Sequence, residues 1–200
     1  MYPVNSRTFL VPLALLCAGL ATGVQAAQGP SFKCSENMLN SVEGLICKSE
    51  DLSSLDRKLA ATYGAALKKA GSRANTLKAE QRGWIKGRNE CWKADDKEAC
   101  LRDNYNQRTV ELQAGYALVE SKGPVIFDCG ANGSISATFF QTDPPSINAT
   151  YKEQHSLMVA VPSGSGMNYK GQNESFWEHQ GEAAVTWGYG AKEMICKRKS

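Results

Sequence analysis

The residues that could perform nucleophilic catalysis are few in this chain, and their spacing is poor. A serine nucleophile needs a neighbouring base, and the chain has two histidines, His155 and His179. Ser165 lies between two glycines in residues 162–166, but this spacing is not the Gly-x-Ser-x-Gly of a hydrolase elbow. A phosphate-binding loop would lead into a helix, whereas strand-like residues follow here. We therefore predict no catalytic residues and a protein that is not an enzyme.

The N-terminal segment has the pattern of a secretory signal. Arg7 precedes an apolar run over residues 9–18, which is too short to span a bilayer comfortably, and small residues precede Ala26. An uncleaved membrane anchor is the alternative. Cys17 follows Leu16 rather than the small residue of a lipid-attachment site. We predict cleavage after Ala26 and a periplasmic or secreted protein.

Charge argues against two classes of partner. The formal net charge is +3, and loss of Arg7 with the signal lowers it by one. This balance is too even to indicate binding to nucleic acid or to an anionic membrane surface. No other segment is apolar enough to cross a membrane, so we expect a soluble mature chain with no membrane span.

Six cysteines follow the signal segment. An even number in an exported chain indicates a disulfide framework. Zinc binding is the competing use, but the chain has no Cys-x-x-Cys pair and few histidines. We expect three disulfides, no metal and no cofactor, formed by Cys34, Cys47, Cys91, Cys100, Cys129 and Cys196.

The chain from Cys34 to about Lys122 has helical periodicity. Ser49 and Asp51 suit a helix start, and Gly71-Ser72 suits its end. A shorter helix over residues 35–46 should precede this one, and two more should follow it in an antiparallel array. The apolar positions of the three long helices are Leu52, Leu55, Leu59, Tyr63 and Leu67; Leu77, Trp84, Ile85 and Trp92; and Leu101, Tyr105, Leu112, Tyr116 and Val119.

Reversal of the chain at Gly71-Ser72 should bring the first long helix against the second. Cys34 and Cys47 would then each pair with one of Cys91 and Cys100, and both crossed arrangements stay open. Asp56 and Arg88 lie on facing turns by the same reasoning. We interpret them as a structural ion pair.

After Gly123-Pro124 the periodicity becomes that of strands. Apolar residues alternate in three short runs, and turn residues separate the runs. Close spacing of several short strands predicts a small antiparallel barrel or sandwich, in which Cys129 and Cys196 would join the first strand to the last. The alternating sets are Val125, Phe127 and Cys129; Ile135, Ala137 and Phe139; and Leu157, Val159 and Val161, with later strands around Phe176-Trp177 and residues 184–187.

Residues 162–166, Pro-Ser-Gly-Ser-Gly, allow two interpretations. The segment can be an ordinary turn. It can also be a recognition loop on a rigid scaffold, because glycines let the backbone approach a partner closely.

The C-terminal half resembles the MliC/PliC family of periplasmic inhibitors of c-type lysozyme. That family shows an opening strand that ends in Cys, a Ser-Gly-x-x-Tyr loop, a Phe-Trp-x-Lys-Gly-x-Glu-Ala segment and a closing Cys. The resemblance implies an eight-stranded antiparallel barrel. The matching residues are 125–129 (Val-Ile-Phe-Asp-Cys), 165–169 (Ser-Gly-Met-Asn-Tyr), 176–183 (Phe-Trp-Glu-His-Gln-Gly-Glu-Ala) and Cys196.

The N-terminal half resembles the helical LprI-type domain, which is also associated with lysozyme inhibition. The matching residues are Cys34, Glu43, Ile46-Cys47, Leu55-Asp56, Glu80-Gln81-Arg82, Trp84, Arg88 and Cys91. Together the two resemblances predict an α+β chain of two domains. We expect a signal peptide at 1–26, a disulfide-stapled helical domain at 27–122 and a β-barrel domain at 123–200.

The resemblance to MliC/PliC implies which residues contact the partner. In that family the serine of the Ser-Gly-x-x-Tyr loop and the lysine of the Phe-Trp segment enter the lysozyme cleft. These positions are Ser165 and His179 here, so histidine replaces the lysine, and Gln180 replaces the glycine after it. Gly166 and Tyr169 complete the loop motif, and Lys170 is a possible substitute cation.

Three functions follow from these observations. The leading hypothesis is a secreted or periplasmic inhibitor that plugs the c-type lysozyme cleft with the Ser165 loop and the His179 segment. The second is a non-inhibitory module of the cell envelope that binds another protein, which the replacement by His179 favours. The weakest is a cell-wall hydrolase.

Overall fold

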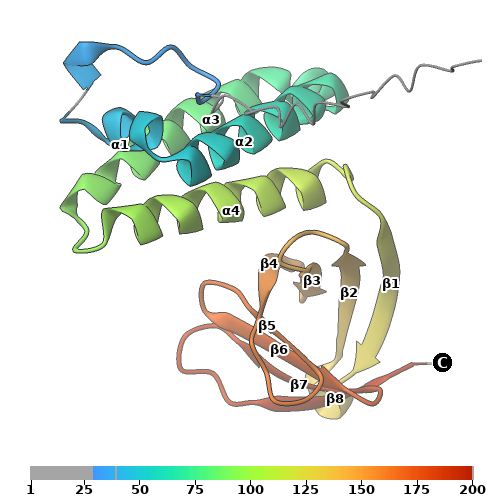
Figure 1. Ribbon diagram of the computed structural model, residues 1–200. Helices are drawn as coiled ribbons and strands as arrows, with labels where there is room; N and C mark the ends of the chain where they lie inside the picture. The colour runs from blue at the N-terminus through green and yellow to red at the C-terminus, as the bar shows by residue number, and fades with distance from the viewer. Residues whose placement is uncertain (1–28, 39, 200) are drawn as a thin grey trace, which may run out of the picture.

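The computed structural model describes residues 29–38 and 40–199 (Figure 1). Helices occupy the N-terminal part of this range and strands occupy the C-terminal part, so the predicted order of an α domain before a β domain is confirmed. The predicted signal peptide, with Arg7, Cys17 and Ala26, lies outside the described residues.

The helical domain contains α1 (Val42–Lys48), α2 (Glu50–Lys69), α3 (Ala74–Asn89) and α4 (Lys97–Gly115). Short 3₁₀ turns join them: η1 (Glu36–Met38), η2 (Gly71–Arg73) and η3 (Glu90–Lys93). Side-chain oxygens cap three helix starts. Ser49 Oγ accepts the Leu52 N–H at the start of α2, as expected, and Ser41 and Asp96 do the same for α1 and α4.

Three helix boundaries differ from the prediction, one of them because α3 ends at Asn89 and leaves Trp92 in η3. Residues 35–46 do not form one helix, because Ser41 caps a new helix after η1. The last helix ends at Gly115, so Tyr116 and Val119 lie beyond it. The reason is local: Ala117 has φ +48°, and the Leu118 N–H donates to the Gln113 carbonyl at 2.9 Å, which closes the helix end.

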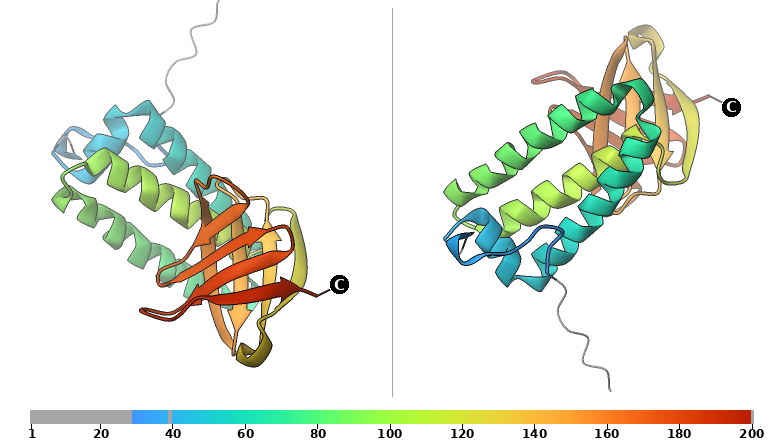
Figure 2. Two further views of the ribbon diagram at one scale, coloured as in Figure 1. Left: turned by 90° about the horizontal axis from the view of Figure 1, so that it is seen from below. Right: turned by 90° about the horizontal axis from the view of Figure 1, so that it is seen from above.

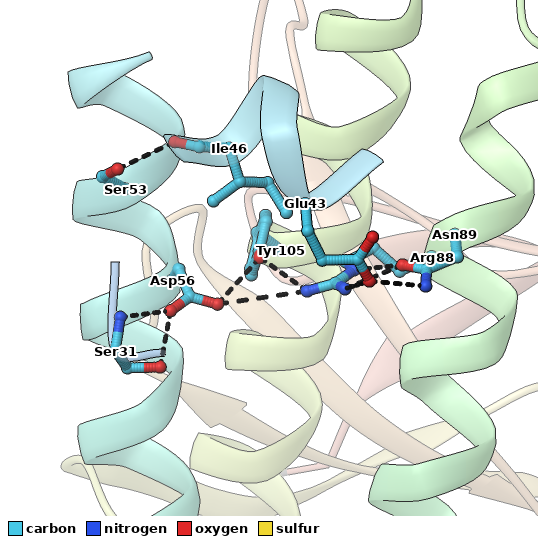
Figure 3. A network of polar contacts seen from close by, with 8 residues as sticks. All are labelled: Ser31, Glu43, Ile46, Ser53, Asp56, Arg88, Asn89 and Tyr105. Carbon is cyan, nitrogen blue, oxygen red and sulfur yellow. Dashed lines mark hydrogen bonds and ion pairs between the residues drawn. The ribbon is translucent and has the colours of Figure 1, made fainter. Parts of the chain in front are cut away.

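A buried ion pair stands at the centre of the helical domain (Figure 3). Arg88 Nη1 lies 4.0 Å from Asp56 Oδ1, and both side chains are at least nine-tenths buried, so the predicted structural pair is confirmed. The Tyr105 hydroxyl bridges the two groups, since it accepts from Arg88 and donates to Asp56, each at 2.8 Å. Burial, with the nearby Asp56 carboxylate, raises the pKa of Tyr105, so its hydroxyl stays neutral as the bridge requires.

The same network reaches α1 and the start of the described chain. Arg88 Nη2 donates to Glu43 Oε1 at 3.2 Å, and the Ser31 N–H donates to Asp56 Oδ2 at 2.7 Å. Segments far apart in sequence therefore share one set of satisfied polar groups (Figure 3).

The disulfide pairing of the helical domain differs from the crossed arrangements. Cys34 bonds to Cys47, and Cys91 bonds to Cys100. Each bridge joins neighbours in sequence, with Cα atoms 6.1 Å and 5.7 Å apart. The chain reverses within each short segment, before α1 and between η3 and α4. Each reversal places a cysteine beside the next cysteine in the sequence. Each bridge therefore closes a short loop at one end of a helix, and neither joins the first long helix to the second.

The C-terminal domain is a closed antiparallel barrel in which each strand pairs with its sequence neighbours and β8 pairs with β1 (Figure 1). The eight-stranded fold implied by the resemblance is thus confirmed. The strands are β1 (Ser121–Asp128), β2 (Ser134–Phe140), β3 (Ser146–Tyr151), β4 (Gln154–Val161), β5 (Met167–Lys170), β6 (Glu174–His179), β7 (Glu182–Trp187) and β8 (Met194–Arg198).

The Cys129–Cys196 disulfide joins the end of β1 to β8, as predicted. Strand character nevertheless begins at Ser121, before Gly123-Pro124. Gly123 has φ +125°, and a Cβ there would lie 2.8 Å from the Ala137 carbonyl, so the glycine lets β1 lie close to β2 where their pairing shifts. The domain division at 122/123 stays a prediction.

Alternation correctly located the core side of β1 and β2 but not that of β4. Phe127, Ile135 and Ala137 point into the barrel, whereas on β4 the buried residue is Met158. Leu157 and Val159 point outward instead. They have a neighbour there: with Val110 of α4 they line a cleft of about 590 Å³ between the helix and the barrel.

The two domains meet along α4. In Figure 1 α4 is the helix that runs nearest the barrel, with α2 and α3 on its far side, and α4 contacts β3. Figure 2 shows the barrel in front of the helices from below and behind them from above. The outward apolar residues of β4 are therefore explained by a second domain, which a strand pattern alone does not reveal.

Candidate functional site

The Ser165 loop, residues 162–166, connects β4 to β5 and exposes the Ser165 side chain. Two donors meet on the backbone carbonyl of Ser165. Ser163 Oγ lies 2.7 Å from that oxygen, and the indole Nε1 of Trp177 lies 2.9 Å from it. One carbonyl can accept two hydrogen bonds, so the loop is fixed at Ser165 itself.

Gly166 brings the loop against the end of β6. Its φ is +63°, and a Cβ built there would lie 2.3 Å from the Glu178 carbonyl and 3.1 Å from the Cβ of His179. No other residue fits without displacing backbone. Two of the predicted site residues, Ser165 and His179, are therefore brought to one edge of the barrel by the glycine between them.

His179 is the last residue of β6, and its side chain is exposed. Its ring stacks on Trp177, with the ring centroids 6.3 Å apart and the planes 18° apart. The turn that follows contains Gln180 and Gly181, with φ of +51° and +86°. Gln180 thus adopts the left-handed conformation that suits glycine, so its replacement of the family's glycine leaves a two-residue turn in place.

The Tyr169 side chain points into the barrel. Tyr169 is 4 % exposed, and its ring lies 6.1 Å from that of Phe139. Burial, with the nearby Glu178 carboxylate, raises the pKa of Tyr169, so the phenol stays neutral. The predicted partner-binding residue is therefore a core residue beneath the loop.

Lys170 lies apart from His179. It pairs with Ser175 at the start of β6, whereas His179 ends that strand, which separates them by roughly 13 Å along the sheet. Lys170 instead lines the cleft between α4 and the barrel. A nearer cation is Lys197 of β8, because its Nζ lies 3.4 Å from Glu182, the residue that pairs with His179.

Trp177 is the site residue that the sequence reasoning missed. The sequence predicts Trp177 only as part of a strand and of a family motif, yet the side chain contacts both Ser165 and His179. The alternation of side chains along a strand could have indicated it. Because Phe176 points into the core, Trp177 has to point outward, where a large apolar side chain is uncommon.

Within residues 29–38 and 40–199, no three His, Cys, Asp or Glu side chains gather as metal ligands. No helix in that same part of the chain has the length and apolar character to span a bilayer.

Two family models match the chain, one on each domain. The model described as "Lysozyme inhibitor LprI" matches residues 34–112, and the model described as "Membrane-bound lysozyme-inhibitor of c-type lysozyme" (MliC) matches residues 127–194. Proteins named "Lipoprotein LprI" from Mycobacterium bovis and Mycobacterium tuberculosis are 29% identical over 192 residues, 95% of this chain and 95% of theirs. Each domain is therefore similar to a family of lysozyme inhibitors, the helical domain to LprI and the barrel domain to MliC.

Proposed function

We propose that this protein is a secreted or periplasmic inhibitor of c-type lysozyme that blocks the active-site cleft with the Ser165 loop and the His179 segment. The observation that carries the proposal is the contact between Gly166 and His179. It brings the Ser165 loop and the end of β6 together in one exposed edge, and a segment that enters a cleft has to be exposed.

The chemistry of the edge complements the cleft. Lysozyme works with one protonated acid and one ionised carboxylate. The exposed Ser165 hydroxyl can hydrogen-bond to either group, and the exposed imidazole of His179 can donate to the carboxylate, more strongly when it is charged. Inhibition of this kind requires no covalent bond to be made or broken.

The proposed location has support from two sides. The cysteines of the described chain form three disulfides, which persist in oxidising compartments. The Mycobacterium relatives carry the word lipoprotein in their names, which places those proteins at an envelope. With the predicted signal peptide, these facts favour export of this chain too.

The direct test adds the purified mature protein to a suspension of bacterial cell walls together with c-type lysozyme. We expect slower clearing of turbidity as inhibitor is added. Clearing at an unchanged rate would contradict the proposal and favour the non-inhibitory module, and clearing without lysozyme would favour a hydrolase.

Two glycines of one loop provide a matched pair of variants. Gly166→Ala places a Cβ against the Glu178 carbonyl and should push the loop away, whereas nothing lies within 4 Å of a Cβ at Gly164. We expect Gly166→Ala to lose at least tenfold in inhibition, roughly the energy of one good hydrogen bond. Gly164→Ala should inhibit like the parent protein. Equal inhibition by all three would remove this loop from the mechanism.

A further inference from the structure

Trp177 contacts both halves of the proposed plug. Its Nε1–H donates to the Ser165 carbonyl at 2.9 Å, and its ring stacks on His179. The two contacts use different parts of the indole, the polar N–H and the apolar face, so one side chain can hold both residues at once.

Apart from the close approach of Gly166 to the end of β6, the loop has few described contacts with the barrel. Residues 162–166 include two glycines, whose backbones are the least restricted of any residue, and the loop is exposed throughout. Apart from the hydrogen bond of Ser163 Oγ to the same carbonyl, the bond from Trp177 is the one described contact that ties Ser165 to another strand. Ser163 lies within the loop and moves with it.

We infer that Trp177 is the positioning residue of the inhibitory edge, which holds the Ser165 loop and His179 in their binding arrangement before lysozyme arrives. The inference rests on the proposed function. Its physical basis is preorganisation: a loop that is already ordered loses less conformational entropy on binding, so its complex is tighter.

The exposure of Trp177 is consistent with this role. Trp177 is 41 % exposed, although Phe176, the preceding residue of β6, and Val185 of the adjacent β7 are fully buried. It therefore contributes little to the barrel core, and its loss should leave the fold intact. A tryptophan needed only for packing would be buried.

Trp187 provides a matched control on the next strand, β7. Its Nε1 also donates a hydrogen bond, to Gln154 Oε1 at 3.0 Å, and its ring packs on Tyr151 at 5.6 Å. It has no described contact with the Ser165 loop. Trp→Phe at either position therefore removes one indole N–H and keeps a ring, but only Trp177→Phe releases the loop.

The test measures inhibition of c-type lysozyme and the backbone order parameters of Ser165 and Gly166 in the free full-length mature protein. Trp177→Phe should raise the inhibition constant about tenfold. It should also lower the order parameters from about 0.85 to below about 0.6. Trp187→Phe should change the inhibition constant by less than about twofold and leave the loop ordered.

Each other outcome overturns the inference. Weaker inhibition with an ordered loop would mean that Trp177 contacts lysozyme and does not position the loop. A mobile loop with full inhibition would mean that positioning has no effect. Should the parent protein fail to inhibit, the proposed function is wrong, and the order parameters still decide separately whether Trp177 holds the loop.

Discussion

The Ser165 hydroxyl is the smallest group on which inhibition should depend. Ser165→Ala removes one hydroxyl from an exposed loop and leaves the carbonyl that Trp177 and Ser163 hold. We expect at least tenfold weaker inhibition, because a hydrogen bond to a charged group contributes about 1.5–3 kcal/mol. Ser134→Ala changes an equally exposed serine at the start of β2 and should have no effect. An unchanged inhibition constant for Ser165→Ala would exclude the hydroxyl from binding.

His179 should make binding depend on pH where a lysine would not. A charged imidazole binds the cleft carboxylate more strongly than a neutral one, so we expect affinity to be higher at about pH 6 than at about pH 8. The His179→Lys variant keeps its charge throughout this range. Isothermal titration of both proteins therefore separates His179 from the titration of lysozyme itself.

The control for that titration is His155→Gln. His155 lies on β4, where Nδ1 is 2.8 Å from Thr150 Oγ1, and it has no described contact with the Ser165 loop. This variant should keep the pH dependence of the parent protein. A parent profile that parallels the His179→Lys profile would show that His179 does not act as a cation.

At the level of elements, the helices were more predictable than the strands. The caps and apolar periodicity of α2 are properties of neighbouring residues, and its predicted start and end agree with Glu50–Lys69. The predicted C-terminal end of α4 and the single helix predicted over 35–46 were wrong, because φ at Ala117 and the cap at Ser41 decide them. Three strands, β3, β5 and β8, were not delimited individually, since short runs of mixed residues acquire strand structure from pairing.

The polar network that joins the helices should make them sensitive to acid through Glu43. Burial by itself raises the pKa of Glu43, but hydrogen bonds from its own backbone, Asn89 and Ser41, with the charge of Arg88, outweigh it and lower the pKa below 4.5. A lowered pKa in the folded state stabilises the fold above the unfolded-state value, and that stability disappears as the pH falls through the folded value.

The expected result is a thermal midpoint of the helical domain that drops between about pH 6 and about pH 3, and drops less in Glu43→Gln. Circular dichroism at the two pH values measures it. Glu36→Gln is the control, because Glu36 is exposed in η1 outside the network. Equal drops in the parent protein and in Glu43→Gln would mean that another carboxylate controls acid unfolding.

At the level of the whole molecule, the three disulfides should differ in their contribution to stability. Cys129–Cys196 spans 67 residues and joins β1 to β8, whereas Cys91–Cys100 spans 9 residues. Loop-closure entropy predicts losses of about 4 and about 3 kcal/mol when each pair is replaced by serines. Urea unfolding followed on each domain measures both. A larger loss for the Cys91–Cys100 pair would contradict an entropic account.

The contact between domains explains residues that neither domain explains alone. Leu157 and Val159 point out of the barrel into the cleft beside α4, together with Val110. Their alternation is genuine, but the face that it marks is turned toward α4 across the cleft and not toward the barrel core. The two family matches, residues 34–112 and 127–194, each contain one side of this cleft: Val110 lies in the first range, and Leu157 and Val159 lie in the second.

The order of helices before strands, the N-cap of α2, the Asp56–Arg88 pair and the Cys129–Cys196 bridge could all be predicted from the residues alone. The N-cap depends on local hydrogen bonding, and the order of elements and the ion pair depend on periodicity. The bridge depends on the pairing of the first strand with the last one in a closed barrel. Through the resemblance the sequence also indicated Ser165 and His179 as the residues to examine.

Four features could be seen only in the folded chain: the pairing of the helical cysteines, the burial of Tyr169, the separation of Lys170 from His179 and the place of Trp177 between Ser165 and His179. Each of these depends on where a strand or turn lies relative to a distant neighbour. Register and chain reversal are set by packing summed over the whole domain, and a pattern of residue types does not specify that sum.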